Sequence, residues 1–343
     1  MKSKRYVNDL HLFSTGISIF LNSLLIILIL TKSSKHLGRY KYLMIYISII
    51  ELFYAILDCL LSPFIYAYNS IFLVIVQTTN NPLIKNKQVL LYLDSILCGF
   101  FGCFMGAFAL QFIYRYYVVS GSIKIKSFND YRMCFWMCIP ILTGVIWGTV
   151  VHVLLPPTAN IDNAIKSILL SDFDTFLENV TYVGLYLYQK QPDNSVQVDL
   201  QSMIGLGVML TIIISSMSFI VICSIKCFLQ LNIYLQINKS ISKTYNNLQV
   251  QLMNALIVQT LIPLFFLHLP CLTIYILTLF NISLGRFSVI LVITTTVFPA
   301  LDPLPVMLII KDYRCAITSI VTTRVVSVKN KSENQRRRHQ VKI

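Results

Sequence analysis

The chain has 343 residues, of which 56% are apolar and only 12% are charged, and its formal net charge is +14. Charged residues make up about 25% of an ordinary soluble domain, so a soluble protein of this composition would expose large apolar patches and aggregate. The apolar residues instead form long runs with few or no charges. This composition excludes an ordinary soluble enzyme, a disordered protein, a fibrous repeat and a secreted disulfide scaffold.

The apolar runs are long enough to cross a bilayer, which requires roughly 20 mostly apolar residues. In chain order they predict spans near residues 10–31, 43–66, 90–114, 134–155, 203–227, 253–280 and 287–310. The first run is longer than the apolar region of a cleavable signal peptide, so we interpret it as a span. The short run Ile71–Val76 is expected to line the mouth of the first loop. We therefore predict an all-α membrane protein, with a seven-transmembrane helix bundle over residues 1–310.

The distribution of positive charge predicts the orientation of this bundle. The loops after spans one, three and five, together with residues 311–343, hold 20 of the 28 Lys and Arg residues. Cytoplasmic loops collect these residues, so the N-terminus is predicted outside and the C-terminus inside. We interpret the basic tail as lying near anionic lipid and expect no nucleic-acid partner.

The segment after span seven has the pattern of an amphipathic helix. Tyr313, Ala316, Ile317, Ile320 and Val321 fall on one helical face, which predicts a short helix lying on the inner leaflet. With Arg115 and the loop at 226–250, it would frame a docking surface for a partner. The alternative is an inert juxtamembrane helix.

Several motifs carry a resemblance to a known family. They are Gly38–Ile45 at the start of span two, Phe112–Tyr116 at the end of span three, Tyr182–Gly184 in the long outer loop, Leu248–Pro263 entering span six, and Phe298–Pro303 through Tyr313–Arg314 around the end of span seven. In their order and spacing, the chain resembles the nematode seven-transmembrane chemoreceptors of the Str superfamily. It differs from the commonest rhodopsin-like pattern in having a tyrosine before Arg115 and no cysteine in the outer loop.

The resemblance implies a G-protein-coupled chemosensory receptor. The expected partners are a small odorant or pheromone-like molecule, a heterotrimeric G protein and the lipid bilayer. By this resemblance Arg115, Tyr116, Tyr313 and Arg314 would face the G protein. The implied location is the plasma membrane, and the family resemblance points to the ciliary membrane of sensory neurons.

Polar residues inside the spans are candidates for a switch. With the inner ends of their spans taken near Leu30, Leu43 and Ile310, the three residues Asn22, Glu51 and Asp302 each lie eight residues inside, which places all three at a depth of roughly 12 Å. Asp58 follows two turns above Glu51 on the same face. Buried charges in a membrane are functional by default, but interhelical hydrogen bonds of this kind also serve structure alone. Both interpretations remain open.

Prolines predict kinks in the last two spans. Pro263 and Pro270 lie in span six, and Pro299 and Pro303 lie in span seven. Each proline removes a helical hydrogen bond and favours a bend, which suits a ligand-driven movement. Prolines are also simply tolerated in membrane helices.

Candidate ligand contacts in the outer halves of the spans are Asp94, His152, His268 and Tyr275. Aromatic and aliphatic neighbours with few polar groups suit a small apolar or weakly polar molecule, although residues of these types more often serve packing than ligand contact. The chain has no phosphate-binding loop, zinc-protease motif or hydrolase nucleophile motif. We expect no enzymatic activity, cofactor or metal.

Two alternative functions are considered. The first is a seven-span ligand-gated cation channel subunit with inverted topology, and the second is a transporter, which would normally show inverted repeats. Glycosylation distinguishes the orientations, because acceptor asparagines must face the lumen. Of four Asn-x-Ser/Thr sites, Asn179 in the long loop is the predicted acceptor, whereas Asn238 and Asn330 are predicted to face the cytoplasm.

Overall fold

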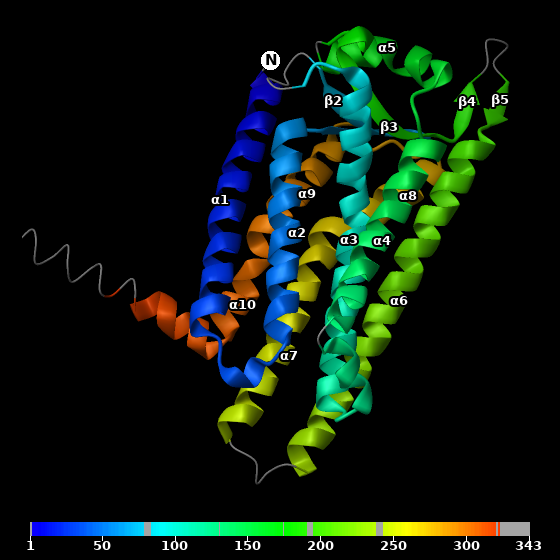
Figure 1. Ribbon diagram of the computed structural model, residues 1–343. Coiled ribbons are helices and arrows are strands. Elements are labelled where there is room, and N and C mark those ends of the chain that lie inside the picture. Colours follow the sequence, from blue (N-terminus) through cyan, green and yellow to red (C-terminus); the bar gives the residue numbers. More distant parts are fainter. Residues whose placement is uncertain are drawn as a thin grey trace, which may run out of the picture.

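The computed structural model describes residues 2–78, 84–129, 131–173, 175–190, 195–237, 243–319 and 322. Within them, seven helical stretches are long and apolar enough to cross a membrane, and they form one bundle (Figure 1). The stretches are α1 (Lys2–Lys32), α2 (Tyr40–Leu61), α3 (Lys87–Val119), α4 (Arg132–Leu154), α6 (Leu200–Ile237), α7 (Lys243–Pro263) with α8 (Leu269–Leu279), and α9 (Val289–Leu301) with α10 (Pro303–Ile309). The predicted seven-span bundle is confirmed.

Helix α3 runs through the middle of the bundle and packs against α2, α4 and α6. Its approach to α4 depends on glycines, because a Cβ atom at Gly102 would lie 2.6 Å from the Thr143 carbonyl oxygen. The Thr143 hydroxyl uses the same proximity and donates a hydrogen bond of 3.0 Å to the Gly102 carbonyl. Small residues bring membrane helices together in this way because van der Waals contact drives their association.

Strands lie at the end of the bundle near α5 (Ala159–Phe173), which we call the sheet end (Figure 1). The antiparallel sheet consists of β1 (Phe64–Tyr68), β2 (Ile71–Gln77) and β3 (Val180–Tyr186), and a separate hairpin pairs β4 (Tyr188–Lys190) with β5 (Val196–Val198). Gly184 pairs with Leu73, and a side chain at Gly184 would collide with the Phe72 carbonyl oxygen. The all-α prediction therefore holds for the membrane spans but missed this sheet.

The predicted second span, 43–66, runs past the end of its helix. Helix α2 ends at Leu61, and Ser62 adopts a left-handed conformation with φ 41°. Pro63 follows, and a proline disfavours the helical conformation of the residue before it. The apolar residues from Phe64 onward then form β1, and the run Ile71–Val76 forms most of β2.

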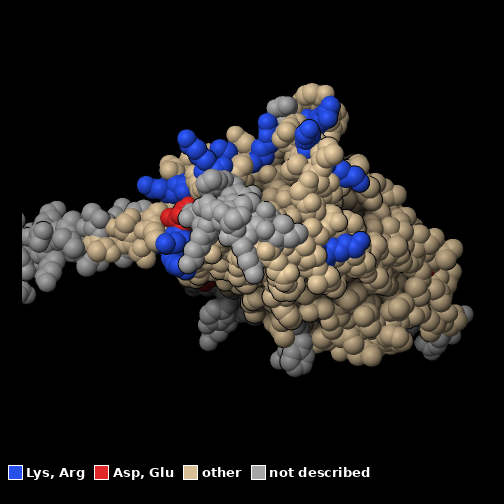
Figure 2. Space-filling view, turned by 90° about the horizontal axis from the view of Figure 1, so that it is seen from below, with Lys and Arg blue, Asp and Glu red and all other residues tan. Residues whose placement is uncertain are grey.

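At the opposite end, which we call the tail end, α10 is followed by a helical segment at 311–319. Tyr313 and Ala316 are buried in a cluster with residues of α1 and α2, and Ile317 packs against it. Ile320 and Val321, the other two residues of the predicted amphipathic face, lie outside the described residues. Figure 2 shows Lys and Arg gathered on the tail-end face, with few acidic residues among them.

Candidate functional site

A partly open cavity of about 80 Å³ lies between the sheet and the membrane spans. Three strands contribute to its roof through Ile65, Phe72, Val74, Val183 and Gly184. Its walls come from six spans. Most of the wall side chains are apolar or aromatic, among them Leu97, Phe101, Trp147, Val151, Met209, Cys271, Tyr275 and Leu291. The polar wall groups include Tyr54 and Asp58 on α2 and Thr295 on α9. Such a cavity suits a small, mostly apolar molecule.

The four residues predicted to contact the ligand lie in different places in the structure. Tyr275 lines the cavity, with its ring edge-on to Phe72 at 5.3 Å between centroids. His268 is buried next to the cavity wall, where its ring contacts Phe101 and its Nδ1 lies 2.9 Å from the Pro263 carbonyl oxygen. His152 lines a different hollow, on the side of the bundle between α2, α3 and α4.

Asp94 is fully buried on α3. Neither of its carboxyl oxygens has a hydrogen-bond partner among the described residues. On a helix, residues three and four positions apart share a face, so Asp94 shares its face with the cavity residues Leu97 and Cys98. A buried polar group without a partner is costly, which makes Asp94 the most conspicuous unsatisfied group near the cavity.

His11, which was not among the residues selected from the sequence, forms a hydrogen bond with Asp58. The Nδ1 atom of His11 lies 2.7 Å from the Asp58 carboxylate and 3.1 Å from the Thr296 hydroxyl, so α1, α2 and α9 meet at this point. His11 and Asp58 are both buried, and Asp58 also lines the cavity. The signal available in the sequence was a lone histidine inside an apolar span, a position that is functional by default.

The structure brings together the three polar residues that were expected at one depth. Asn22, Glu51 and Asp302 are all buried, and the Glu51 carboxyl group lies beside the side chains of both Asp302 and Asn22. Gln259 of α7 joins them, with its amide donating a hydrogen bond of 2.6 Å to the Asp302 carboxylate. Gln259 belongs to the Leu248–Pro263 motif, but its role in this layer was missed. Asp58 belongs to the separate pair with His11.

Prolines in span seven leave backbone carbonyls that other spans use. A proline cannot donate to the carbonyl four residues before it, so Pro303 leaves the Pro299 carbonyl free and Pro299 leaves that of Thr295 free. Asn22 Nδ2 donates to the Pro299 oxygen at 2.9 Å, and the Ser18 hydroxyl donates to it at 3.1 Å. The Tyr54 hydroxyl donates to the Thr295 oxygen at 3.2 Å. These bonds tie α1 and α2 to span seven.

The prolines of span six accompany a change of helix type. Helix α7 ends at Pro263, a π-helical turn covers Leu264–His268, and α8 begins at Leu269 with Pro270 in its first turn. A π-helical turn inside a membrane helix is often found at functional sites. It lies at the level of His268, next to the wall of the cavity.

At the tail end, Arg115 is enclosed. Its side chain is 1% exposed, its guanidinium donates to the Gln249 carbonyl of α7 at 3.1 Å, and it lies over the Tyr40 ring of α2 at 5.4 Å. The predicted G-protein-facing residue is therefore covered by α7 in this conformation. A movement of α7 would uncover it.

The other residues expected at this face differ in exposure. Tyr116 is partly buried, and Arg314 is exposed, donating to the Leu308 carbonyl at 3.1 Å. Tyr313 is buried and shares a hydrogen bond of 2.7 Å with the Ser33 hydroxyl. Burial raises the pKa of Tyr313 to about 12, although the Ser33 hydrogen bond acts in the opposite direction.

The comparisons with known proteins identify the family. A family model described as serpentine type 7TM GPCR chemoreceptor Str matches residues 8–318. The chain belongs to the Str family of chemoreceptors. It is 31% identical to the G-protein coupled receptor str-217 of Caenorhabditis elegans over 89% of this chain and 87% of that protein. It is 28% identical to serpentine receptor class r-10 of the same species, over 88% and 86% of the two chains.

The fold of the receptor is also known from a distant solved structure. The crystal structure of squid rhodopsin matches with a TM-score of 0.60 and 13% identity, over 92% of this chain and 80% of that chain. Membership of the Str family makes the protein a chemosensory G-protein-coupled receptor that crosses the plasma membrane several times. The channel and transporter alternatives are not favoured.

The predicted glycosylation site of the receptor lies in the segment before β3. Asn179 is partly buried, and its carbonyl accepts a hydrogen bond of 2.9 Å from the backbone N–H of Thr78. It lies at the sheet end, as does the start of α1 (Figure 1). Asn238 and Asn330 lie outside the described residues.

Proposed function

We propose that the receptor binds a small apolar or weakly polar molecule, odorant-like or pheromone-like, in the cavity beneath the sheet. The observation that carries this proposal is that both Tyr54 and Asp58 line this one cavity. These two side chains hold α2 to α9 and to α1 through hydrogen bonds. A ligand in the cavity therefore touches groups that hold the spans together.

We propose that Tyr275 and Asp94 contribute the polar contacts to the ligand. Tyr275 lies on the cavity wall, and its hydroxyl has a weak partner, the Met209 sulfur at 3.7 Å. Asp94 has no partner among the described residues, so it would favour a ligand with a hydrogen-bond donor. His268 supports the wall from behind, through its ring contact with Phe101.

Side-chain contacts connect the cavity to the tail end of the bundle. Tyr54 packs edge-on against Phe104 and Phe298. Closer to the tail end, span seven is joined to α7 by the polar layer that consists of Asn22, Glu51, Asp302 and Gln259. Helix α7 in turn covers Arg115 through the Gln249 carbonyl. We propose that ligand binding shifts α9 and releases α7, with the bend at η4 (Leu264–His268) as the hinge, and that a heterotrimeric G protein binds the uncovered surface. Such a change is a population shift between two packed states.

The proposed orientation has the sheet end outside the cell and the tail end in the cytoplasm. The support is the gathering of Lys and Arg on the tail-end face (Figure 2), together with the rule that cytoplasmic loops are enriched in these residues. This orientation gives the cavity access from outside and gives a G protein access to α7 and the 311–319 helix.

The test is a second-messenger assay in a heterologous cell, with a panel of small volatile compounds. A compound that activates the wild type should lose potency in Tyr275→Phe and Asp94→Asn, at matched surface expression. The control is Leu142→Phe, an exposed residue on the side of α4 that faces away from the bundle, and this variant should respond normally. Responses that persist as ion fluxes with G proteins blocked would instead support a channel.

A further inference from the structure

A second hollow lies on the outside of the bundle, where α2, α3 and α4 face the bilayer. It is a groove of about 460 Å³, and it is lined almost entirely by apolar side chains. Its lining includes Phe53 of α2, Ile96 of α3 and Ile141 and Val145 of α4, all of which are exposed. The cavity beneath the sheet shares none of the residues that line it.

Glycines form the floor of this groove. Gly99 of α3 and Gly144 and Gly148 of α4 line it. A Cβ atom at Gly99 would lie 2.8 Å from the Gly144 carbonyl oxygen, and one at Gly148 would lie 3.0 Å from that of Ser95. The Gly144–Gly148 pair has the spacing that joins membrane helices, but within this chain it is already used against α3. The groove therefore has a floor without side chains at these three positions, and it is not a free helix-pairing face.

One end of the groove has a defined hydrogen-bonding character. His152 Nδ1 lies 3.2 Å from the Ser95 hydroxyl oxygen, and that hydroxyl donates its hydrogen to the Leu91 carbonyl at 2.9 Å. The histidine must then donate through Nδ1, which leaves Nε2 as an acceptor in the neutral ring. No hydrogen bond to Nε2 is present among the described residues. Tyr92 stacks on the ring at 4.6 Å and fixes its plane.

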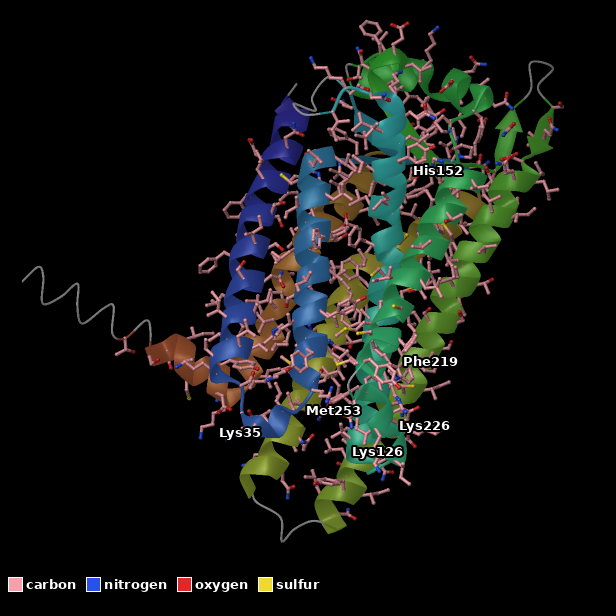
Figure 3. The ribbon with its side chains drawn as sticks, viewed as in Figure 1. Lys35, Lys126, His152, Phe219, Lys226 and Met253 are labelled. Carbon is pink, nitrogen blue, oxygen red and sulfur yellow. The ribbon has the colours of Figure 1, made fainter. Side chains whose placement is uncertain are left out.

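The position of His152 places this acceptor near the membrane surface. It lies two residues before the end of α4, at the sheet end (Figure 3). From His152 to Ile141, at the other end of the groove on α4, the helix rises roughly 16 Å. Half of the hydrocarbon core of a bilayer is about 15 Å thick. The groove therefore spans one leaflet, with the His152 acceptor near the headgroups and its apolar length toward the midplane.

We propose that this groove binds a sterol-like alcohol from the membrane. A hydroxyl group at the headgroup level would donate to His152 Nε2, and a rigid, flat apolar body would lie on the glycine floor between Phe53 and Val145. A phospholipid fits less well, because its bulky headgroup carries no single hydroxyl at this depth and its two flexible chains do not match one groove with a single polar end. The proposal concerns a different face from the ligand cavity and does not depend on the proposed function.

The experiment uses the full-length receptor in nanodiscs that contain a photoreactive sterol with a free 3-hydroxyl group. Labelling of peptides from α3 and α4 is measured by mass spectrometry. Excess cholesterol should compete for this labelling, whereas its 3-keto analogue, which lacks the donor, should compete about fivefold less well, the factor expected for one hydrogen bond. Equal competition by both sterols, or stronger competition by diacylglycerol, would overturn the assignment.

Two variants locate the site. Val145→Trp fills the groove and should abolish labelling, whereas Leu142→Trp is the matched control, because Leu142 is 59% exposed against 58% for Val145 but lies outside the groove. His152→Phe keeps the aromatic stack on Tyr92 and removes the acceptor, so the preference for the hydroxyl over the keto sterol should disappear. Labelling of α3 and α4 that persists in Val145→Trp, or a preference that persists in His152→Phe, would contradict the proposal.

Discussion

The side-chain amide of Asn22 donates a hydrogen bond of 2.9 Å to the Pro299 carbonyl, which is available because Pro303 has no N–H to offer it. Span one thus completes the hydrogen bonding of span seven. The Ser18 hydroxyl shares the same acceptor, and the Tyr54 hydroxyl repeats the arrangement at Thr295. Polar side chains of α1 and α2 therefore complete the backbone hydrogen bonding that the prolines of span seven interrupt.

We predict that Asn22→Ala destabilises the receptor by about 1 kcal/mol, because the Pro299 carbonyl keeps only the Ser18 hydroxyl as a partner. Pro303→Ala restores a backbone donor to that carbonyl, so Asn22→Ala should cost less in this background. The measurement is a double-mutant cycle on the thermal unfolding of the purified receptor. Thr31→Ala, which removes an exposed hydroxyl from the same helix, is the control. Strictly additive effects would show that the two positions are not coupled.

Asp302→Ala should change basal or agonist-driven signalling while surface expression stays close to that of the wild type. The substitution removes the acceptor of the Gln259 amide and so loosens α7 from span seven. Gln259→Ala is expected to act in the same direction, and the double variant should be little different from either single one. The control is Glu178→Ala, which removes an exposed carboxylate at the sheet end, away from the proposed G-protein surface. Unchanged signalling per surface receptor would leave the layer with a packing role only.

His11→Leu should destabilise the receptor by about 3–5 kcal/mol, because it leaves the buried Asp58 carboxylate without its partner. Replacing both residues, in His11→Leu with Asp58→Leu, removes the unpaired charge. The double variant is therefore expected to unfold at a temperature closer to the wild type than His11→Leu alone. Thermal unfolding in detergent measures both. A double variant as unstable as the sum of its singles would argue against a coupled pair.

Arg115→Ala is expected to abolish G-protein activation and to leave ligand affinity in membranes nearly unchanged, because Arg115 is at the tail end of α3, far along the helix from the cavity. Nucleotide exchange on a co-expressed G protein reports activation, and radioligand or competition binding reports affinity once a ligand is found. Lys126→Ala removes a positive charge from the exposed loop nearby (Figure 3) and serves as the control. Normal activation by Arg115→Ala would remove this residue from the mechanism.

Glycosidase treatment should increase the gel mobility of the wild-type receptor, and Asn179→Gln should remove most of that shift. The reason is that Asn179 lies at the sheet end, which the proposed orientation exposes to the lumen during synthesis. Asn238→Gln and Asn330→Gln are the controls and should keep the shift. A shift that survives Asn179→Gln but is lost in either control would reverse the orientation and undermine the proposed G-protein surface.

The sequence by itself determined the seven spans, because crossing a bilayer depends on the length and apolarity of each segment and hardly on its neighbours. It also indicated that Asn22, Glu51 and Asp302 lie at one depth, since helical rise is regular. These three side chains meet in the structure. The motifs in their order and spacing carried the family resemblance, which the family model confirms.

Only the tertiary structure decided which face each polar residue uses and which distant segments pair. His152 and Tyr275 were equivalent candidates in sequence, yet one lines the membrane-facing groove and the other the cavity. The rotation of each helix in the bundle is set by contacts with other spans, so it cannot be derived from one helix alone. For the same reason the pairing of β2 with β3, more than a hundred residues apart in the chain, and the bond from His11 to Asp58 emerged only when the spans were packed.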